Sequence, residues 1–68
     1  MNDESLNLSL RKFLKMVGVS SQREIEKAVA AAHASGDIQG TESFPATMTL
    51  EVGGLKLRAT FDGEIRLS

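Results

Sequence analysis

The sequence predicts a small soluble α+β domain in which two N-terminal helices pack on one face of a three-stranded antiparallel β-meander (α-α-β-β-β). Three observations favour this fold class. Apolar residues recur at helical spacing in the first half of the chain. In the last third they alternate with polar residues, as in a half-buried strand. Two turn signals, Gly53-Gly54 and Asp62-Gly63, interrupt that alternation. We therefore expect one domain over residues 1–68, with a helical hairpin at 1–36, a loop at 37–45 and the meander at 46–68.

The first helix is expected near residues 4–17. Its apolar residues fall on one stripe of a helical surface: Leu6, Leu10, Phe13, Leu14 and Val17. Asp3 and Glu4 lie near the positive end of the helix dipole, where acidic groups are stabilising. Gly18 can take the left-handed conformation that commonly ends a helix, so we expect the helix to end there.

The second helix is expected near residues 21–35. Ser21 and Glu24 have the S-x-x-E spacing of a capping box, which marks the start of a helix. The apolar stripe that follows is rich in small residues: Ile25, Ala28, Val29 and Ala32. Gly36 is expected to end this helix, as Gly18 does the first.

Three strands are expected near residues 46–52, 55–61 and 64–68. Pro45 can begin the first strand without removing a hydrogen bond from the ladder. Because successive side chains of a strand point to opposite faces, one face of the meander is apolar and the other carries mixed charge. Both helices should pack on the apolar face, which comprises Met48, Leu50, Val52, Leu55, Leu57, Ala59, Ile65 and Leu67.

The register of the sheet follows from its turns. A two-residue turn at Gly53-Gly54 would pair Val52 with Leu55 and set Glu51 opposite Lys56, which is a favourable charge pair. The second turn is expected to contain three residues. A two-residue turn there would move the third strand's apolar side chains to the wrong face.

Composition excludes several classes of function. The 68 residues include no cysteine and one histidine, so the chain has no disulfide and a structural zinc site is not expected. The net charge is −1, and no basic block of the kind that binds phosphates is present. The acidic, polar start is not a signal peptide, and no apolar run is long enough to span a bilayer. We expect a cytoplasmic protein without a metal or an organic cofactor.

An enzyme is not expected either. His33 is the chain's one histidine, and it is expected in the last turn of the second helix, where the dipole favours a cation. It has no second histidine, serine or carboxylate placed to form a catalytic pair. A domain of this size also buries only about 60% of its unfolded surface, which leaves little volume for a pocket beside a core.

The preferred interpretation is a non-catalytic protein-interaction module that contacts an unknown protein or a second copy of itself. An unpaired edge strand can accept a strand from a partner, and a cluster of basic residues can contact an acidic surface. The candidate partner-facing residues are Arg11, Lys12 and Lys15 on the first helix and Thr47, Thr49 and Glu51 on the first strand.

The alternative is a nucleic-acid-associated regulator with a helix-turn-helix-like pair and a β-hairpin wing. The predicted order is a helix, the short turn Gly18-Val19-Ser20 and a second helix, which is the order of a helix-turn-helix motif. However, Glu24 and Glu26 would lie in the first two turns of the recognition helix, where phosphates approach. The chain is also net acidic, so nucleic acid is the less favoured partner.

Four segments resemble a family of short uncharacterised bacterial proteins, a domain of unknown function. They are residues 9–15 (SLRKFLK), 17–28 (VGVSSQREIEKA), 53–55 (GGL) and 62–65 (DGEI). The resemblance covers nearly the whole chain. It implies a bacterial source, and it brings no activity and no catalytic or binding residues.

Overall fold

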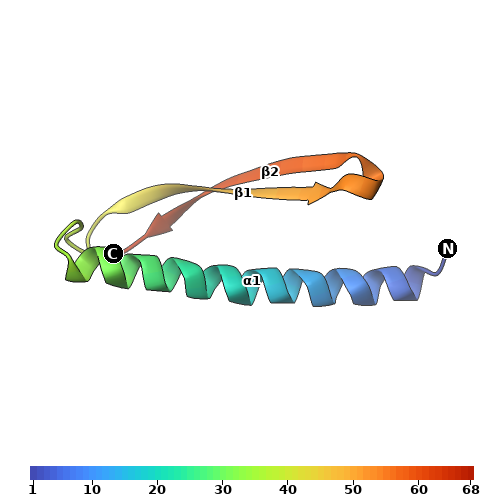
Figure 1. Ribbon diagram of the computed structural model, residues 1–68, viewed down its shortest axis with the longest axis horizontal. Helices are drawn as coiled ribbons and strands as arrows, with labels where there is room; N and C mark the ends of the chain where they lie inside the picture. The colour runs from blue at the N-terminus through green and yellow to red at the C-terminus, as the bar shows by residue number, and fades with distance from the viewer. The chain divides into compact units, whose positions relative to one another are not determined.

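The computed structural model describes residues 1–68 and contains one long helix followed by a β-hairpin (Figure 1). The elements are helix α1 (Asp3–Ala34), strand β1 (Ser43–Val52), the short 3-10 helix η1 (Gly53–Leu55) and strand β2 (Leu57–Arg66). The order is therefore α-β-β, and the predicted arrangement of two helices and three strands is wrong. The chain divides into two compact units, Met1–Asp37 and Ile38–Ser68. That the chain forms one domain stays a prediction.

Helix α1 begins as the sequence predicts and then continues through the expected break. The Asn2 side chain accepts a hydrogen bond from the Ser5 backbone N–H at 3.0 Å and caps the first turn. Gly18 and Ser21 lie inside the helix rather than at a C-terminus and an N-cap. The helix–turn–helix arrangement considered for nucleic acid therefore has no turn in this structure.

The continuous helix has a physical reason. An interior glycine costs about 1 kcal/mol relative to alanine, and a serine less than that. A break would cost more, because two new helix ends would each leave backbone groups without intrahelical partners. The two predicted stripes are also in phase: Leu14 and Ile25 lie eleven residues apart, which is close to three full turns. One helix therefore carries both stripes on one side.

The C-terminus of α1 is where the sequence predicts it. Gly36 has a φ of 82° and takes the left-handed conformation after the cap residue Ser35. The Gly36 N–H donates to the His33 carbonyl at 3.2 Å, and the Asp37 N–H donates to the Ala32 carbonyl at 2.9 Å. This pair of bonds is the Schellman motif, which satisfies carbonyls that the end of the helix leaves free.

Strands β1 and β2 form a two-stranded antiparallel sheet whose register differs from the predicted one by two residues. Val52 pairs with Leu57 instead of Leu55, and the chain turns through four residues, of which Lys56 is left-handed with a φ of 52°. The Lys56 N–H donates to the Gly53 carbonyl at 3.1 Å and closes the turn. Because the shift is an even number of residues, every strand side chain keeps its predicted face.

The predicted second turn at Asp62-Gly63 is absent, and β2 runs straight through it. Asp62 pairs with Thr47 and Gly63 pairs with Ala46, so both residues belong to the ladder. The Thr47 hydroxyl donates to an Asp62 carboxylate oxygen at 2.9 Å, an interaction that favours a strand here over a turn. The predicted second and third strands are therefore one strand.

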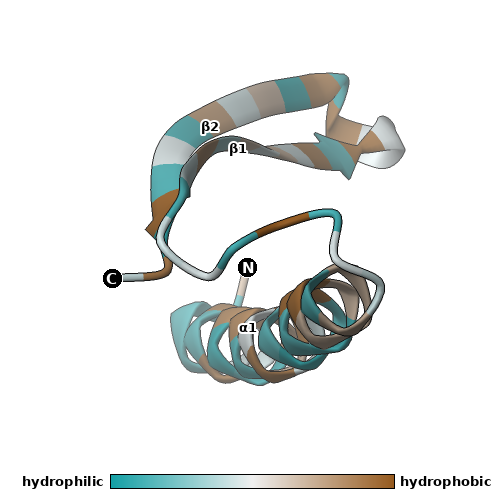
Figure 2. Ribbon diagram, turned by 90° about the vertical axis from the view of Figure 1, so that its left-hand side faces the viewer, coloured by the Kyte–Doolittle hydropathy of each residue, from teal (hydrophilic) through white to brown (hydrophobic).

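Neither unit buries a side chain within itself. Hydrophobic and hydrophilic residues alternate along the strands, as the banded colouring of Figure 2 shows. Because alternate side chains of a strand point to opposite faces, the hairpin has one apolar face. On this face Leu50, Ala59 and Ile65 are half-buried, whereas Met48, Leu57 and Phe61 are exposed. Helix α1, although 32 residues long, is nowhere apolar enough over a sufficient length to cross a membrane.

Candidate functional site

The predicted partner-facing residues of β1 lie on the polar face of the hairpin, and they face residues of β2. Thr47 donates to Asp62, Thr49 stands opposite Thr60, and the Glu51 carboxylate lies 3.6 Å from Arg58 Nε. Such exposed cross-strand pairs each contribute at most about 1 kcal/mol, but together they favour one register. Beyond this ladder, the outer edge of β1 is unpaired, as the sequence predicts for an edge strand.

The predicted basic residues lie on one stretch of α1. Arg11, Lys12 and Lys15 form no ion pair, whereas further along the helix Lys27 Nζ lies 2.9 Å from Glu24 Oε2. Arg11 and Lys15 are four residues apart, so their like charges meet on the helix surface and destabilise it by about 0.2–0.5 kcal/mol. An acidic group brought to this stretch would relieve that repulsion.

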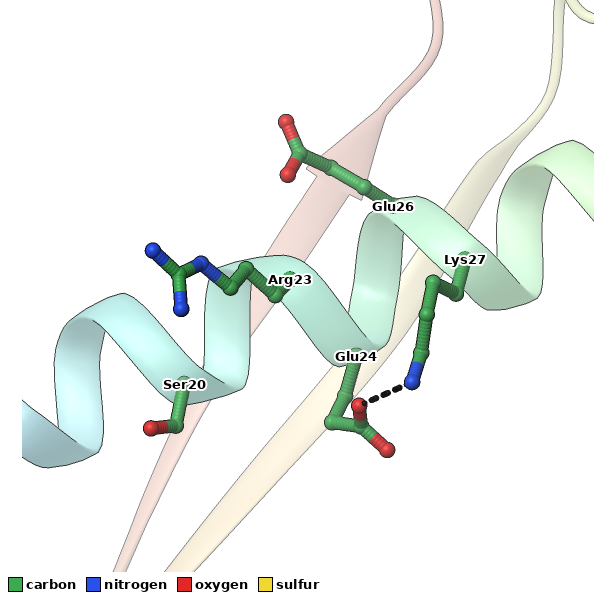
Figure 3. A pocket seen from close by; sticks show the side chains of 5 residues that line it. All are labelled: Ser20, Arg23, Glu24, Glu26 and Lys27. Carbon is green, nitrogen blue, oxygen red and sulfur yellow. Dashed lines mark ion pairs between the residues drawn. The ribbon is translucent and has the colours of Figure 1, made fainter.

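A hollow lies along the middle of α1 and is lined by Ser20, Arg23, Glu24, Glu26 and Lys27 (Figure 3). All five residues come from one short stretch of helix, and Glu24 and Glu26 point to opposite sides of it. The two acidic and two basic side chains leave no net charge. A small-molecule site is usually an enclosed cavity, whereas this surface is open and is lined by charged and hydroxyl-bearing side chains.

A second hollow, of about 210 Å³, lies on the hairpin beside Ser43, Phe44, Pro45, Gly63 and Glu64. It is smaller than the roughly 300–1,000 Å³ of typical ligand pockets. No three histidine or acidic side chains of the chain come together in a way that could hold a metal ion. His33 lies in the last turn of α1, where the sequence places it.

Glu42 is the residue with the most organised polar surroundings, and the sequence analysis did not single it out. Its carboxylate accepts hydrogen bonds from three backbone N–H groups: Gln39 at 2.8 Å, Gly40 at 2.9 Å and Thr41 at 3.1 Å. These bonds, that of Gln39 above all, lower the pKa of Glu42 below its usual value of 4.5. Its carbonyl accepts from the Leu67 N–H at 3.0 Å.

The role of Glu42 is structural. The loop between α1 and β1 turns its amides inward, with Gly40 at a φ of 97°, and the carboxylate satisfies them. The bond to Leu67 extends the sheet ladder beyond β2. A glycine two residues before a glutamate is the one signal in the sequence that points to this turn, and it is a weak one.

The helix unit also has an apolar face. Helix α1 carries a mainly apolar stripe along its length, which we call the α1 stripe and in which Ser21 is the one polar residue: Leu6, Leu10, Leu14, Val17, Ser21, Ile25, Ala28 and Ala32. Leu14, near its middle, is 58% exposed. Apolar residues gathered in this way form a patch, whereas single apolar residues scattered over a surface are ordinary.

These features define a small helix–hairpin protein with apolar surfaces. The chain belongs to the family of unknown function DUF6494, whose family model matches residues 1–68. This finding confirms the predicted resemblance to an uncharacterised domain. No curated protein and no solved structure matches the chain. A bacterial source and a cytoplasmic location stay predictions.

Proposed function

We propose that this protein is a non-catalytic interaction module that functions by binding protein through the α1 stripe. The observation that carries the proposal is that neither unit buries a side chain within itself, although both carry large apolar residues. Burial of apolar surface is the dominant favourable term in folding and in most protein association, at about 25 cal/mol per Å². A partner would supply the burial that is missing.

The distribution of polar groups supports the non-catalytic part of the proposal. General acid–base or nucleophilic catalysis needs two or three groups within hydrogen-bonding reach of one another and of a substrate. Here the hydroxyls of Thr47 and Ser9 donate within the chain, to Asp62 and to the Leu6 carbonyl. The carboxylate of Glu42 is already occupied by three amides.

Cross-linking in the cells that make the protein tests the proposal. A tagged chain should be recovered in a covalent complex of defined mass above that of the monomer. Leu14→Ser, which places a hydroxyl on the α1 stripe, should abolish that complex. The matched control is Leu8→Ser, because Leu8 is equally exposed, at 60%, but lies off the stripe.

Circular dichroism must show the same helix content in both variants, so that a lost complex reflects a lost surface rather than a lost helix. Recovery of the monomer alone from wild-type cells would contradict the proposal. So would a complex that Leu8→Ser abolishes and Leu14→Ser leaves intact.

A further inference from the structure

We infer that the outer edge of strand β1 pairs with the same edge of a second copy of this chain, so that two hairpins form one antiparallel sheet. The inference goes beyond the proposed function, because it concerns a different surface from the α1 stripe. It uses only contacts within the hairpin unit, Ile38–Ser68. Three observations carry it: the direction of the free backbone groups of β1, the charges along the two edges of the sheet, and the match of β1 with itself in one register.

The backbone groups of every second residue of β1 point away from β2. In an antiparallel ladder, residues that bond the neighbouring strand alternate with residues that do not. One step beyond the Ser43–Arg66 pair, Glu42 accepts a hydrogen bond from the Leu67 N–H at 3.0 Å, so the even-numbered residues of β1 bond β2. The odd-numbered residues therefore direct their backbone groups to the outer edge: Ser43, Pro45, Thr47, Thr49 and Glu51. Pro45, which has no N–H, belongs to this outward set, as expected for a proline in a strand.

The outer edge of β1 carries fewer charges than that of β2. Native proteins often use charged side chains to keep an edge strand from pairing. On β2 the residues opposite the outward set are all charged except Thr60: Arg66, Glu64, Asp62, Thr60 and Arg58. On β1 the one charged residue is Glu51. We therefore expect a strand to pair with the outer edge of β1 rather than with that of β2.

Pro45 limits the registers in which two β1 strands can pair. A strand that gains a second neighbour becomes central, and proline is not found in the middle of a ladder. The longest antiparallel overlap that leaves Pro45 outside sets Thr49 opposite Thr49 of the second copy, and Thr47 opposite Glu51 in both directions. Each of these pairs exchanges two backbone hydrogen bonds, and the pairs are related by a two-fold axis. Every outward N–H of β1 beyond Pro45 then has a partner.

Side chains on both faces are compatible with this register. On the polar face threonine meets threonine at the axis, which is a favourable cross-strand pair. Glu51 lies four residues, or about 14 Å, along the strand from its own copy, so no like charges oppose each other. On the apolar face Met48 meets Leu50 and Ala46 meets Val52, which continues the apolar face across both hairpins.

Pairing through β1 also supplies what a hairpin lacks. A two-stranded hairpin is at best marginally stable in water, whereas three or more strands with an apolar face can be stable. The hairpin unit has a sheet of two strands. In the paired sheet both β1 strands are central, and the charged edges of the two β2 strands are outermost.

Disulfide cross-linking tests the pairing and its register, and the chain has no cysteine to interfere. Thr49→Cys should oxidise to a covalent dimer, because opposite residues of a bonded pair lie about 5.5 Å apart at Cα, within the range of a disulfide. Thr60→Cys is the matched control, since Thr60 stands opposite Thr49 in the hairpin and is also exposed. Its copy lies three strand spacings away, about 14 Å, which is too far. On a non-reducing gel we expect a dimer from Thr49→Cys alone.

A backbone variant tests the same edge without a covalent bond. Thr49→Pro removes an outward N–H and leaves the bonds between β1 and β2 in place. At a concentration at which the wild-type chain is dimeric by sedimentation equilibrium, this variant should be monomeric. Thr60→Pro removes the corresponding N–H from the outer edge of β2 and should stay dimeric. Circular dichroism must show the same strand content in both variants.

Each other outcome overturns the inference. A covalent dimer from Thr60→Cys alone would place the contact at β2, and a dimer formed only when the two cysteine variants are mixed would mean head-to-tail pairing. A wild-type monomer at high concentration, or a dimer that Thr49→Cys does not cross-link, would exclude this register. Leu14→Ser, which tests the α1 stripe, should leave the Thr49→Cys dimer intact. A failure of the proposed function and a failure of this inference are therefore distinguishable.

Discussion

The two units of this protein are stabilised in different ways. Helix α1 is stabilised by local interactions: each interior backbone hydrogen bond joins residues four apart, and both ends of the helix are capped. The hairpin depends on pairs between β1 and β2, from Ser43 with Arg66 at one end to Val52 with Leu57 at the other. A helix of this length tolerates a poor residue inside it, whereas a hairpin depends on its turn and on its cross-strand pairs. Each unit nevertheless carries an apolar surface that it cannot bury within itself.

The largest expected effect is on the free energy of unfolding, and it distinguishes an α1 helix that is covered by a partner from one that is exposed to solvent. Leu14→Ala should destabilise the protein by about 2–5 kcal/mol if the stripe is buried against a partner, because a cavity replaces the side chain. Leu8→Ala is the matched control and should cost less than about 1 kcal/mol. Denaturant unfolding followed by circular dichroism measures both. The transition of the wild-type protein should also move with the concentration of the partner, as unfolding linked to binding does. If Leu14→Ala and Leu8→Ala lowered the free energy of unfolding equally, the two faces of α1 would not differ in burial.

The next effect concerns the hairpin turn and decides its register. Lys56 is left-handed, a conformation that costs a residue other than glycine about 1–2 kcal/mol. Lys56→Gly should therefore stabilise the protein, by about 1 kcal/mol after the extra entropy of glycine in the unfolded chain is subtracted. Under the register predicted from the sequence, Lys56 is a strand residue, and the same change would be destabilising. The sign of the shift in the urea midpoint thus distinguishes the two registers.

Gly18 provides a test of whether α1 is one continuous helix. A side chain added there meets no atom within 4 Å, so Gly18→Ala should stabilise the helix by about 1 kcal/mol. A chain that breaks into two helices at Gly18 would be destabilised instead, because alanine does not readily adopt a left-handed cap. Ser21→Ala is the companion variant. It should change stability by no more than a few tenths of a kcal/mol in a continuous helix, against a loss of about 0.5–2 kcal/mol at an N-cap.

The smallest effect lies in the loop between α1 and β1. Because the folded pKa of Glu42 is lowered, its contribution to stability is fully present above its usual value of 4.5 and is lost as the pH falls through the folded pKa. An NMR titration should show the amides of Gln39, Gly40 and Thr41 shifting together at a pH below 4.5. Glu42→Gln should abolish that titration and increase amide exchange at these three residues. A midpoint at or above the ordinary value would show that the carboxylate is not bound.

The sequence predicted the ends of the helical region and the faces of the sheet, because both depend on short-range signals. Asn2 and Gly36 lie at the two ends of α1, and strand alternation assigns a face regardless of register. It failed at Gly18 and at Asp62-Gly63, which were interpreted as breaks. In each case the surroundings outweigh the local preference: the helix stripe stays in phase across Gly18, and Thr47 binds Asp62 across the sheet.

The candidate site was predicted only in part. The unpaired edge of β1 and the basic stretch on α1 are present, but the residues selected on β1 pair with β2 across the sheet. The α1 stripe was visible in the sequence as two shorter stripes, each of which was assigned to an internal core. The eleven-residue spacing between Leu14 and Ile25 is the signal that joins them. The contacts of Glu42 could not be predicted, since they depend on the backbone path of an irregular loop.

The short sequence separation of the contacts within each unit also determines how fast each can form. Isolated helices of about 20 residues relax in roughly 0.1–1 μs and hairpins form in about 1–10 μs, because their contacts need little loop closure. Pairing of two chains is a second-order step that slows on dilution. In the inferred dimer, refolding would therefore show a fast phase that is independent of concentration and a slower one proportional to it. The abundance of the chain in the cell would then set how long the outer edge of β1 stays unpaired.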